Sequence, residues 1–438
     1  MCPAPDREGG SFHRIRHPKD GRRALGKGQE YPTGYCSEKR VKKRVDGSIK
    51  NKIPLCVPHI GKEDLMYIQH ALKSNWVSSV GPDVERFESV VARESGRAFA
   101  VATVNGTSAL HLAFLAMGLG PGDEVLVPTL TFIASINPIR YTGAWPIFMD
   151  AEPSFFQMDV AKTAEFLKNN CRRDGRSLIN KSSGRRVRAI VPVHILGHPV
   201  DMDPLMVLAR RYGLTVIEDA AEALGSVYRG RRVGSLGDMG CFSFNGNKII
   251  TTGAGGMVVT DNPEWAERIR YYSTQARCSS REDFIHDDIG FNYRLSNLQA
   301  VLGLAQMARF THFLKRKHAI AKSYRESLKN IAGLRCIEDA PWCCSNSWLS
   351  AVCLAGEKPI PKLSVVRAHL ALRGIESRPL WKPIHRQRPY RRCETYRLEW
   401  ADWLHDRVLC LPSSVGLTWS DQRRVIASLK ESVREAAQ

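Results

Sequence analysis

The first clear pattern in the chain is helical. Apolar side chains recur at the spacing of one helix face at Leu65, Ile68 and Leu72, and a second helical pattern follows Pro82. The run AFAVATV at 98–104 then has the continuous apolar character of a buried strand. Two helices are therefore predicted to precede the first strand.

The same alternation continues through the middle of the chain. Strand-like runs occur at 124–128, 145–150, 188–197 and 214–226, and helical patterns begin near Phe132, Asp159 and Pro204. Apolar strands that alternate with helices indicate a mostly parallel sheet covered on both faces, which is an α/β fold. Ligands of such sheets bind beyond the carboxyl ends of the strands, where this chain places residues 105–108, 129–132 and 218–222.

The last third of the sequence predicts a smaller α/β domain. A long apolar-periodic helix at 295–314 leads into it, and a strand at 349–355 and a helix at 362–373 follow. We therefore predict a large domain at 53–312 and a small C-terminal domain at 313–438.

Composition places the protein among soluble two-domain chains. It has 438 residues, of which 43% are hydrophobic. No apolar run is long enough to span a membrane, and the first residues lack the apolar segment of a secretion signal, so we expect a cytoplasmic protein. The twelve cysteines are scattered without the spacing of a metal site or a disulfide framework.

Charge adds one feature, a basic N-terminal arm. Of the net charge of +20, residues 1–50 contribute +7, with 13 Lys and Arg against 6 Asp and Glu, and few aliphatic residues accompany them. This composition predicts disorder. A second basic stretch, 171–188, is predicted to be a solvated loop, although it could also attract a phosphate-bearing substrate. The runs at 39–44 and 184–188 could touch RNA, but no nucleic-acid recognition motif accompanies them.

A candidate phosphate site lies where the strand at 98–104 meets the next helix. Asn105, Gly106, Thr107 and Ser108 combine free helix N–H groups, two hydroxyls and a glycine that lets the backbone approach a ligand. The alternative is an ordinary Thr or Ser helix cap. The stretch lacks the spacing of a Walker loop.

Lys248 is the candidate nucleophile. It stands in a short polar turn between two runs of small and β-branched residues, with the glycines 253, 255 and 256 behind it. A lysine held beside a carbonyl can form a Schiff base, and the aldehyde of pyridoxal phosphate (PLP) is the obvious partner. The alternative is a solvated loop lysine.

Three further side chains would complete a PLP site. Asp219 follows the buried run LTVI, where a carboxylate could pair with a protonated pyridine nitrogen or cap a helix. Phe132 could lie on the cofactor ring or belong to the core. Ser243, five residues before Lys248, could add a hydroxyl to the phosphate site.

The order of these motifs resembles one family. NGTSALH, then VIEDAAEALGS, then FSFNGNKIITTGAGGM and finally GFNYRLSNLQA are similar to the DegT/DnrJ/EryC1/StrS family of PLP-dependent nucleotide-sugar aminotransferases, from about Ile53 to the C-terminus. The opening residues of this region and the basic insert look most like the LegC-type branch. The resemblance implies PLP-dependent transferase fold type I, the aspartate aminotransferase-like fold.

The resemblance also implies roles around the ring. Lys248 would be the Schiff-base lysine and proton carrier, and Asp219 would hold the pyridine nitrogen. Phe132 would stack on the ring face opposite the substrate, and Glu222 would lie near the ring hydroxyl. Many relatives have G-E-G-G after the lysine, whereas this chain has Gly-Ala-Gly-Gly at 253–256, so that glutamate is absent.

The remaining implied roles concern the phosphate and the substrate. Thr107, Ser108 and Ser243, with Gly106 in the same turn, would bind the phosphate. Asn292 would reach the phosphate of the neighbouring subunit's cofactor, which implies a homodimer with active sites at the subunit interface. The stretch 378–390 resembles the substrate-side loop, where Trp381 and His385 could face the sugar nucleotide or belong to a surface loop.

The function implied is amino transfer from glutamate to the keto carbon, C4 by expectation, of a nucleotide-linked 6-deoxy sugar, in making an amino sugar for a surface polysaccharide or glycan. No metal is expected. Related sugar dehydratases carry histidine in place of the Schiff-base lysine, so Lys248 favours the transaminase. A non-catalytic regulator, or a nucleic-acid binder using the basic arm, remains the alternative from another class.

Overall fold

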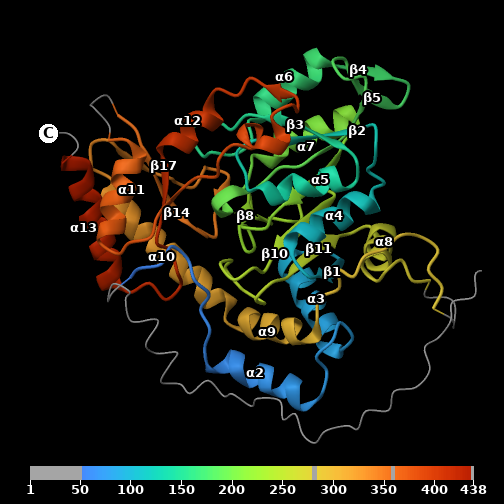
Figure 1. Ribbon diagram of the computed structural model, residues 1–438, viewed down its shortest axis with the longest axis horizontal. Helices are drawn as coiled ribbons and strands as arrows, with labels where there is room; N and C mark the ends of the chain where they lie inside the picture. The colour runs from blue at the N-terminus through green and yellow to red at the C-terminus, as the bar shows by residue number, and fades with distance from the viewer. Residues whose placement is uncertain (1–51, 279–283, 357–360, 436–438) are drawn as a thin grey trace, which may run out of the picture. The chain divides into compact units, whose positions relative to one another are not determined.

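The computed structural model describes residues 52–278, 284–356 and 361–435 (Figure 1). The predicted disordered arm, residues 1–50, and its run at 39–44 lie outside the described residues. Within the described ranges, no helix is long and apolar enough to cross a membrane. The predicted boundary between 53–312 and 313–438 stays a prediction.

The main sheet confirms the predicted α/β architecture. It has ten strands among the described residues, and its principal path runs β1, β11, β10, β7, β6, β2, β3, β16. The pairs from β10 to β16 are parallel, whereas β11 is antiparallel to both β1 and β10. The strands are β1 Phe99–Thr103, β11 Gly256–Thr260, β10 Met239–Ser243, β7 Thr215–Asp219, β6 Arg186–Ile190, β2 Asp123–Pro128, β3 Trp145–Met149 and β16 Thr395–Tyr396.

Apolar residues cover both faces of this sheet. Along β2, Val125 and Val127 belong to one buried cluster and Leu126 to the other, and along β7 Ile217 and Val216 divide in the same way. Successive strand side chains point to opposite faces, so a strand buried on both sides must be apolar at nearly every position. The continuous apolar runs in the sequence have this cause.

The basic stretch at 171–188 is not the solvated loop predicted from its charge. It forms a hairpin, β4 Cys171–Asp174 and β5 Ser177–Asn180, and β5 pairs with β6. Arg185 and Arg186 form ion pairs with Glu124 and Asp123 of β2. The stretch is therefore an extension of the sheet, whose arginines are partly neutralised by acidic residues of a neighbouring strand.

Helices form at the predicted positions, with two differences. The helix predicted from about Phe132 begins as the 3-10 helix Ile133–Ser135 and continues as the short α5 Asn137–Tyr141. The predicted helix at 295–314 is two helices that meet at Arg309, whose backbone is not helical. The α-helices are α2 Lys62–Lys73, α3 Pro82–Ser95, α4 Gly106–Ala116, α5 Asn137–Tyr141, α6 Val160–Asn170, α7 Met202–Tyr212, α8 Pro263–Ser273, α9 Asn297–Ala308, α10 Phe310–Leu328, α11 Leu363–Leu372, α12 Trp400–Arg407 and α13 Trp419–Glu435. Short 3-10 helices occupy Ile133–Ser135, Ile195–Gly197, Ile384–Arg386 and Arg388–Tyr390.

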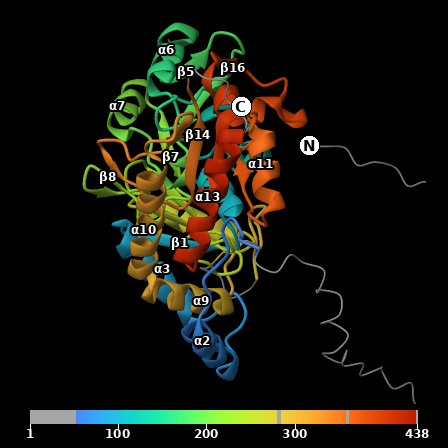
Figure 2. The same ribbon diagram turned by 90° about the vertical axis from the view of Figure 1, so that its left-hand side faces the viewer.

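A second sheet carries the C-terminal part of the chain. Its order is β12 Leu334–Cys336, β14 Ser350–Leu354, β17 Val408–Leu411 and β15 Arg378–Pro379, all antiparallel. Helices α11 and α13 lie side by side near it in both views (Figures 1 and 2). A small third sheet joins β13 Cys343–Cys344, β8 Val227–Tyr228 and β9 Arg231–Arg232.

A buried carboxylate fixes the end of β7. The Glu218 side chain is fully buried and accepts hydrogen bonds from the backbone N–H groups of Gly234, Leu236 and Gly237 at 2.7–2.9 Å. His194 Nε2 lies 3.0 Å from the same carboxylate, and because His194 Nδ1 accepts from the Val200 N–H, Nε2 carries the proton. Burial alone would raise the pKa of Glu218, but these donors lower it below its ordinary value.

We expect Glu218→Gln to lower the free energy of unfolding by about 3 kcal/mol, because an amide cannot accept from all four donors. Urea unfolding measures the loss, with the exposed Glu326→Gln on α10 as control. Since the folded pKa of Glu218 is lowered, the stabilisation is complete above the ordinary value of 4.5 and is lost as the pH falls below it. A loss equal to that of the control would contradict this role.

Candidate functional site

A cavity of about 630 Å³ opens at the carboxyl ends of the parallel strands. Its wall includes residues that follow β1, β2, β7 and β10, which is where an open α/β sheet binds ligands. Eight of the residues predicted for the site line it, namely Gly106, Thr107, Phe132, Asp219, Glu222, Ser243, Lys248 and Trp381. The volume lies within the range of about 300–1,000 Å³ typical of small-molecule sites.

The N-terminus of α4 forms one end of the cavity. The helix cap is Asn105, whose side chain accepts from the Ser108 N–H at 2.8 Å, so the predicted alternative of a Thr or Ser cap is wrong. A Cβ on Gly106 would lie 2.9 Å from Ser243 Cβ, which shows how closely the two loops approach. The end of the helix therefore presents backbone N–H groups and the hydroxyl-bearing Thr107 and Ser243 to an anion.

Lys248 is held inside the cavity, and the alternative of a solvated loop lysine is wrong. Its backbone N–H donates to Asn245 O at 2.9 Å in the turn between β10 and β11, and only 13% of its side chain is exposed. Its ammonium nitrogen lies 3.3 Å from Glu222 Oε1 and 4.2 Å from the centre of the Trp348 ring. The Trp348 indole N–H in turn donates to Asn247 O at 2.7 Å, beside Lys248 in the chain.

Glu222 is the carboxylate that faces Lys248. Its Oε2 accepts from the Leu196 N–H at 2.8 Å, which leaves Oε1 directed at the lysine. Burial raises the pKa of Glu222, and the Lys248 charge opposes this rise. A carboxyl group with a raised pKa beside an amine can exchange a proton with it.

Asp219 ends β7, and turns follow it, so the alternative of a helix cap is wrong. Its Oδ1 accepts from the Ala221 N–H at 3.1 Å, and its Oδ2 accepts from the Ser135 hydroxyl at 2.6 Å. Thr131 Oγ1 lies 2.8 Å from Ser135 Oγ. The chain therefore places a nearly buried carboxylate, with two donors of its own, in the cavity wall.

Aromatic side chains form another part of the wall. Phe132 is 55% exposed although it is a large apolar residue, and its place in the cavity lining, not the core, explains that exposure. Trp381 stacks on Trp348, with ring centres 6.5 Å apart and planes at 10°. Arg378 of β15 lines the cavity near Trp381 and forms an ion pair with Glu376.

Three predicted residues do not line the cavity. Ser108 is buried behind the α4 N-terminus, and Asn292 is exposed in a bridge to Thr274. His385 Nδ1 lies 2.8 Å from Thr129 Oγ1, and Nε2 lies 3.4 Å from Asp402. Burial lowers the pKa of His385, and Asp402 opposes that shift. The roles implied for these three residues stay predictions.

Sequence reasoning missed several residues that line or support the cavity. Ser135, Trp348 and Arg378 belong to this group. Ser135 stands in the segment that follows β2, just beyond the strand-end group 129–132 that the sequence indicated, so the same rule applied to a longer segment could have found it. Trp348 gave no such signal, because it comes from a loop exactly a hundred positions beyond Lys248 in the sequence.

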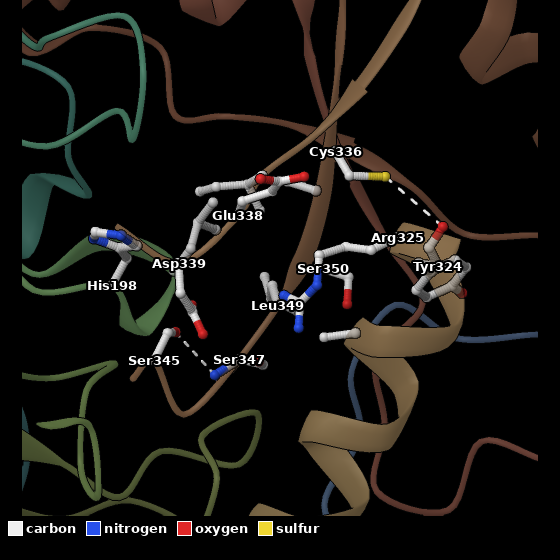
Figure 3. Close-up of a pocket in the computed structure, with 14 residues that line it drawn as sticks. His198, Tyr324, Arg325, Cys336, Glu338, Asp339, Ser345, Ser347, Leu349 and Ser350 are labelled. Atoms are coloured by element: carbon white, nitrogen blue, oxygen red, sulfur yellow. Dashed lines mark hydrogen bonds between the residues drawn. The ribbon is translucent and has the colours of Figure 1, made fainter. Parts of the chain in front are cut away.

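A second cavity is too small to compete with this site. Figure 3 shows it beside α10, between segments that flank β12 and β14, with Arg325, Asp339 and His198 in its wall. Its volume is about 20 Å³, enough for a water molecule, which needs about 10–15 Å³. None of the predicted site residues lines it.

Comparison with known proteins identifies related chains. The family model described as the DegT/DnrJ/EryC1/StrS aminotransferase family matches residues 58–430. A GDP-perosamine synthase from Caulobacter vibrioides is 40% identical over 382 residues, covering 87% of this chain and 98% of the relative. A GDP-perosamine synthase from Escherichia coli O157:H7 is 38% identical over 333 residues, covering 76% and 85%. These names do not bear on the LegC-type branch, which stays a prediction.

Solved structures agree with this result. DesI, determined in the presence of its TDP-sugar product, matches with a TM-score of 0.79 at 29% identity, covering 89% of this chain and 95% of DesI. The aminotransferase TlmJ from Streptoalloteichus hindustanus matches with a TM-score of 0.77 at 28% identity, covering 87% and 99%. The predicted fold type is confirmed.

Aminotransferases of this family depend on PLP, and the cavity fits that cofactor. A helix N-terminus with hydroxyls suits its phosphate, a lysine suits its aldehyde, and a buried carboxylate suits its ring nitrogen. The close approach of Gly106 to Ser243 leaves no room for a side chain where the phosphate end would lie. Gly106, Thr107, Ser243, Lys248 and Asp219 would hold the group.

We expect Gly106→Ala to weaken PLP binding at least tenfold, because the new methyl group would press on Ser243 and narrow the anion site. Equilibrium titration followed by the cofactor's absorbance measures the change. Gly120→Ala is the matched control, since a Cβ there meets nothing within 4 Å. Equal affinities in the two variants would show that this turn does not hold the phosphate.

Proposed function

This chain belongs to the DegT/DnrJ/EryC1/StrS family of PLP-dependent aminotransferases, and from that premise we propose that it moves the amino group of glutamate to keto carbon C4 of a nucleotide-linked 6-deoxy sugar. The names of the perosamine synthases and the sugar-nucleotide product of DesI support a nucleotide-sugar substrate. The observation that carries the proposal is the position of Lys248, enclosed beside Glu222 in the same cavity as Asp219.

Lys248 has two tasks in this proposal. PLP, when bound, supplies an aldehyde that takes up amino groups and a ring that accepts the electron pair of the neighbouring carbon. Lys248 would hold the cofactor at its aldehyde and, once the amino donor takes that place, would carry a proton to and from the donor's Cα. Glu222, 3.3 Å from the amine, can take up or return the proton that Lys248 gains and loses.

Asp219 would keep the ring of bound PLP positively charged. A carboxylate opposite the ring nitrogen favours the protonated nitrogen, which strengthens the ring as an electron acceptor. Phe132, exposed into the cavity, would cover one ring face, and the opposite face would remain for the substrate. Charging the ring and covering its face both need side chains that are fixed before the substrate arrives. The hydrogen bonds to Asp219 fix its carboxylate in this way.

The two substrates would enter the same cavity in turn. Glutamate gives its nitrogen and leaves as 2-oxoglutarate before the sugar nucleotide arrives, so the cycle is ping-pong. Among the described residues that line the cavity, Lys248 and Arg378 are the cations, and Lys248 is committed to the reaction. Arg378 is therefore placed to pair with a carboxylate or phosphate of the substrate, beside the flat faces of Trp348 and Trp381.

The experiment is a pair of half-reactions. Glutamate should convert the PLP form to the pyridoxamine form with release of 2-oxoglutarate, and a panel of 4-keto-6-deoxysugar nucleotides should then identify the acceptor by mass spectrometry. Lys248→Arg keeps the charge but cannot form the imine or shuttle the proton, so turnover should fall at least about a thousandfold. Lys322→Arg, at an exposed position of α10, is the control.

Two results would contradict the proposal. Near-normal turnover in Lys248→Arg would remove the lysine from the reaction. If the enzyme aminates 3-ketosugars and turns over no 4-ketosugar in the panel, the acceptor carbon is C3 and the proposed C4 is wrong. If glutamate does not convert PLP to the pyridoxamine form but another amino acid does, the proposed amino donor is wrong and the proposed sugar acceptor still stands.

We further propose a homodimer. Helix α2 lies at the lower end of the unit in both views (Figures 1 and 2). It presents Leu65 and Met66 with 56% and 65% of their surfaces exposed, and the segment that follows it exposes Trp76, Val77 and Val80. We infer that these exposed apolar side chains belong to an interaction site, because large apolar patches on a protein surface mark such sites. The exposed Asn292 lies outside its own chain's cavity, in keeping with a role at a neighbour's cofactor.

We expect the double variant Leu65→Asp, Met66→Glu to shift the protein to monomers and to reduce PLP affinity, because charge on α2 cannot be buried against a second copy. Sedimentation velocity measures the oligomeric state. Leu372→Glu is the control, a substitution at an 83% exposed leucine on α11. A dimer of unchanged stability in the double variant would place the interface elsewhere.

A further inference from the structure

A short chain of two hydroxyl groups in the cavity wall leads to Asp219. Ser135 Oγ is 2.6 Å from Asp219 Oδ2, and Thr131 Oγ1 is 2.8 Å from Ser135 Oγ. Thr131 is 1% exposed, Ser135 2% and Asp219 5%. Thr131 and Ser135 both come from the segment between β2 and α5, whereas Asp219 ends β7.

The direction of these hydrogen bonds follows from the number of protons. An ionised carboxylate only accepts, so the single hydroxyl proton of Ser135 points to Asp219 Oδ2. Ser135 Oγ then accepts from Thr131, because the 2.8 Å contact between the two hydroxyls is shorter than the other contact open to the Thr131 proton, 3.4 Å to Phe132 O. Both donors in the chain are thus directed toward the carboxylate, and each strengthens the next.

The second oxygen of the carboxylate is held from its own strand end. Asp219 Oδ1 accepts from the Ala221 N–H at 3.1 Å. Each carboxylate oxygen has a further lone pair, so the two protein donors leave acceptor capacity facing the cavity that Asp219 lines. The Asp219 side chain is therefore fixed in orientation but can still accept further hydrogen bonds.

We propose that Ser135, oriented by Thr131, is a positioning residue that keeps Asp219 ionised and directed into the cavity, so that the proton shared with the cofactor's ring nitrogen stays on the ring. The inference rests on the proposed function only in requiring PLP in this cavity; it does not depend on the sugar or on the amino donor. Ser135 acts through Asp219 and does not itself touch the reacting atoms.

The physical reason is a competition for one proton. A carboxylate without donors in a buried site binds a proton more strongly, because burial penalises its charge. The proton between Asp219 and the ring nitrogen would then move toward the carboxylate, and the ring would lose the charge that makes it an electron acceptor. A hydrogen bond to a charged group is strong enough to change this equilibrium about tenfold to a hundredfold.

The test follows the ring nitrogen directly. The holoenzyme is loaded with PLP that is isotope-labelled at the ring nitrogen, and solid-state NMR at neutral pH reports whether that nitrogen is protonated. The wild type should show the protonated signal. Ser135→Ala should move the signal toward that of neutral pyridine and slow the glutamate half-reaction about tenfold or more. Thr131→Val should produce a smaller change in the same direction.

Conservative and matched variants separate positioning from structure. Ser135→Thr retains the hydroxyl and should keep the protonated signal, whereas Ser135→Cys retains the volume with a weak donor and should lose it. Ser95→Ala is the control, since Ser95 is equally buried but donates only to Ala92 O within α3. Asp219→Asn gives the signal of a ring without its carboxylate.

A protonated ring in both Ser135→Ala and Ser135→Cys would overturn the inference. The outcomes also separate it from the proposed function. If the wild type binds PLP with a protonated ring but aminates no sugar nucleotide, the proposed function fails and the role of Ser135 is still tested by the same spectra. If the wild type aminates the sugar and the Ser135 variants match it in spectrum and rate, only this inference fails.

Discussion

The site depends on two adjacent carboxylates buried at the end of one strand. Glu218 and Asp219 point to opposite faces of β7, because successive strand side chains alternate. Neither can remain charged there without donors, since burial of an unpaired carboxylate is costly. Glu218 is compensated by His194 and three backbone N–H groups, which anchors the loop at 234–237 behind the sheet. Because Glu218 fixes the opposite face of the strand end, Asp219 is held in place where it lines the cavity.

The order of strands in the parallel sheet brings the other site residues next to Asp219. Because β10 lies next to β7, the turn that carries Lys248 comes to the same edge as Asp219, and the antiparallel strand β11 returns the chain past the start of α4. The backbone of Gly256 approaches Asn105 so closely that a Cβ would lie 2.5 Å from it. The phosphate end, the lysine and the ring-nitrogen carboxylate are thus assembled by strand order, and glycine is needed where the segments touch.

The sequence predicts those site residues that stand in a local pattern, and it does not predict contacts between residues far apart in the chain. Lys248 and Asp219 stand in local patterns, a polar turn between strands and the end of an apolar run, and the structure places both in the cavity. Trp348 was missed because its contact with Lys248 is a tertiary one. The stretch 171–188, which forms the β4–β5 hairpin and the start of β6, was predicted as a loop because its charge is high, yet acidic residues of β2 neutralise part of that charge. No proline or glycine stands at the helix break at Arg309, so the sequence contains no local signal that predicts it.

Two carboxylates face the same cavity with different surroundings, and this difference divides their work. Asp219 accepts from two donors within the protein, a hydroxyl and a backbone N–H, which hold one of its oxygens each. Glu222 has one backbone donor and Lys248; burial raises its pKa, and the nearby charge of Asp219 adds to the rise. One carboxylate is therefore suited to hold a charge constant and the other to exchange a proton, as in enzyme sites where environment assigns acid and base roles. Since Oε2 of Glu222 is bound by the Leu196 N–H, the oxygen that exchanges is Oε1, and it is the one that faces the amine of Lys248.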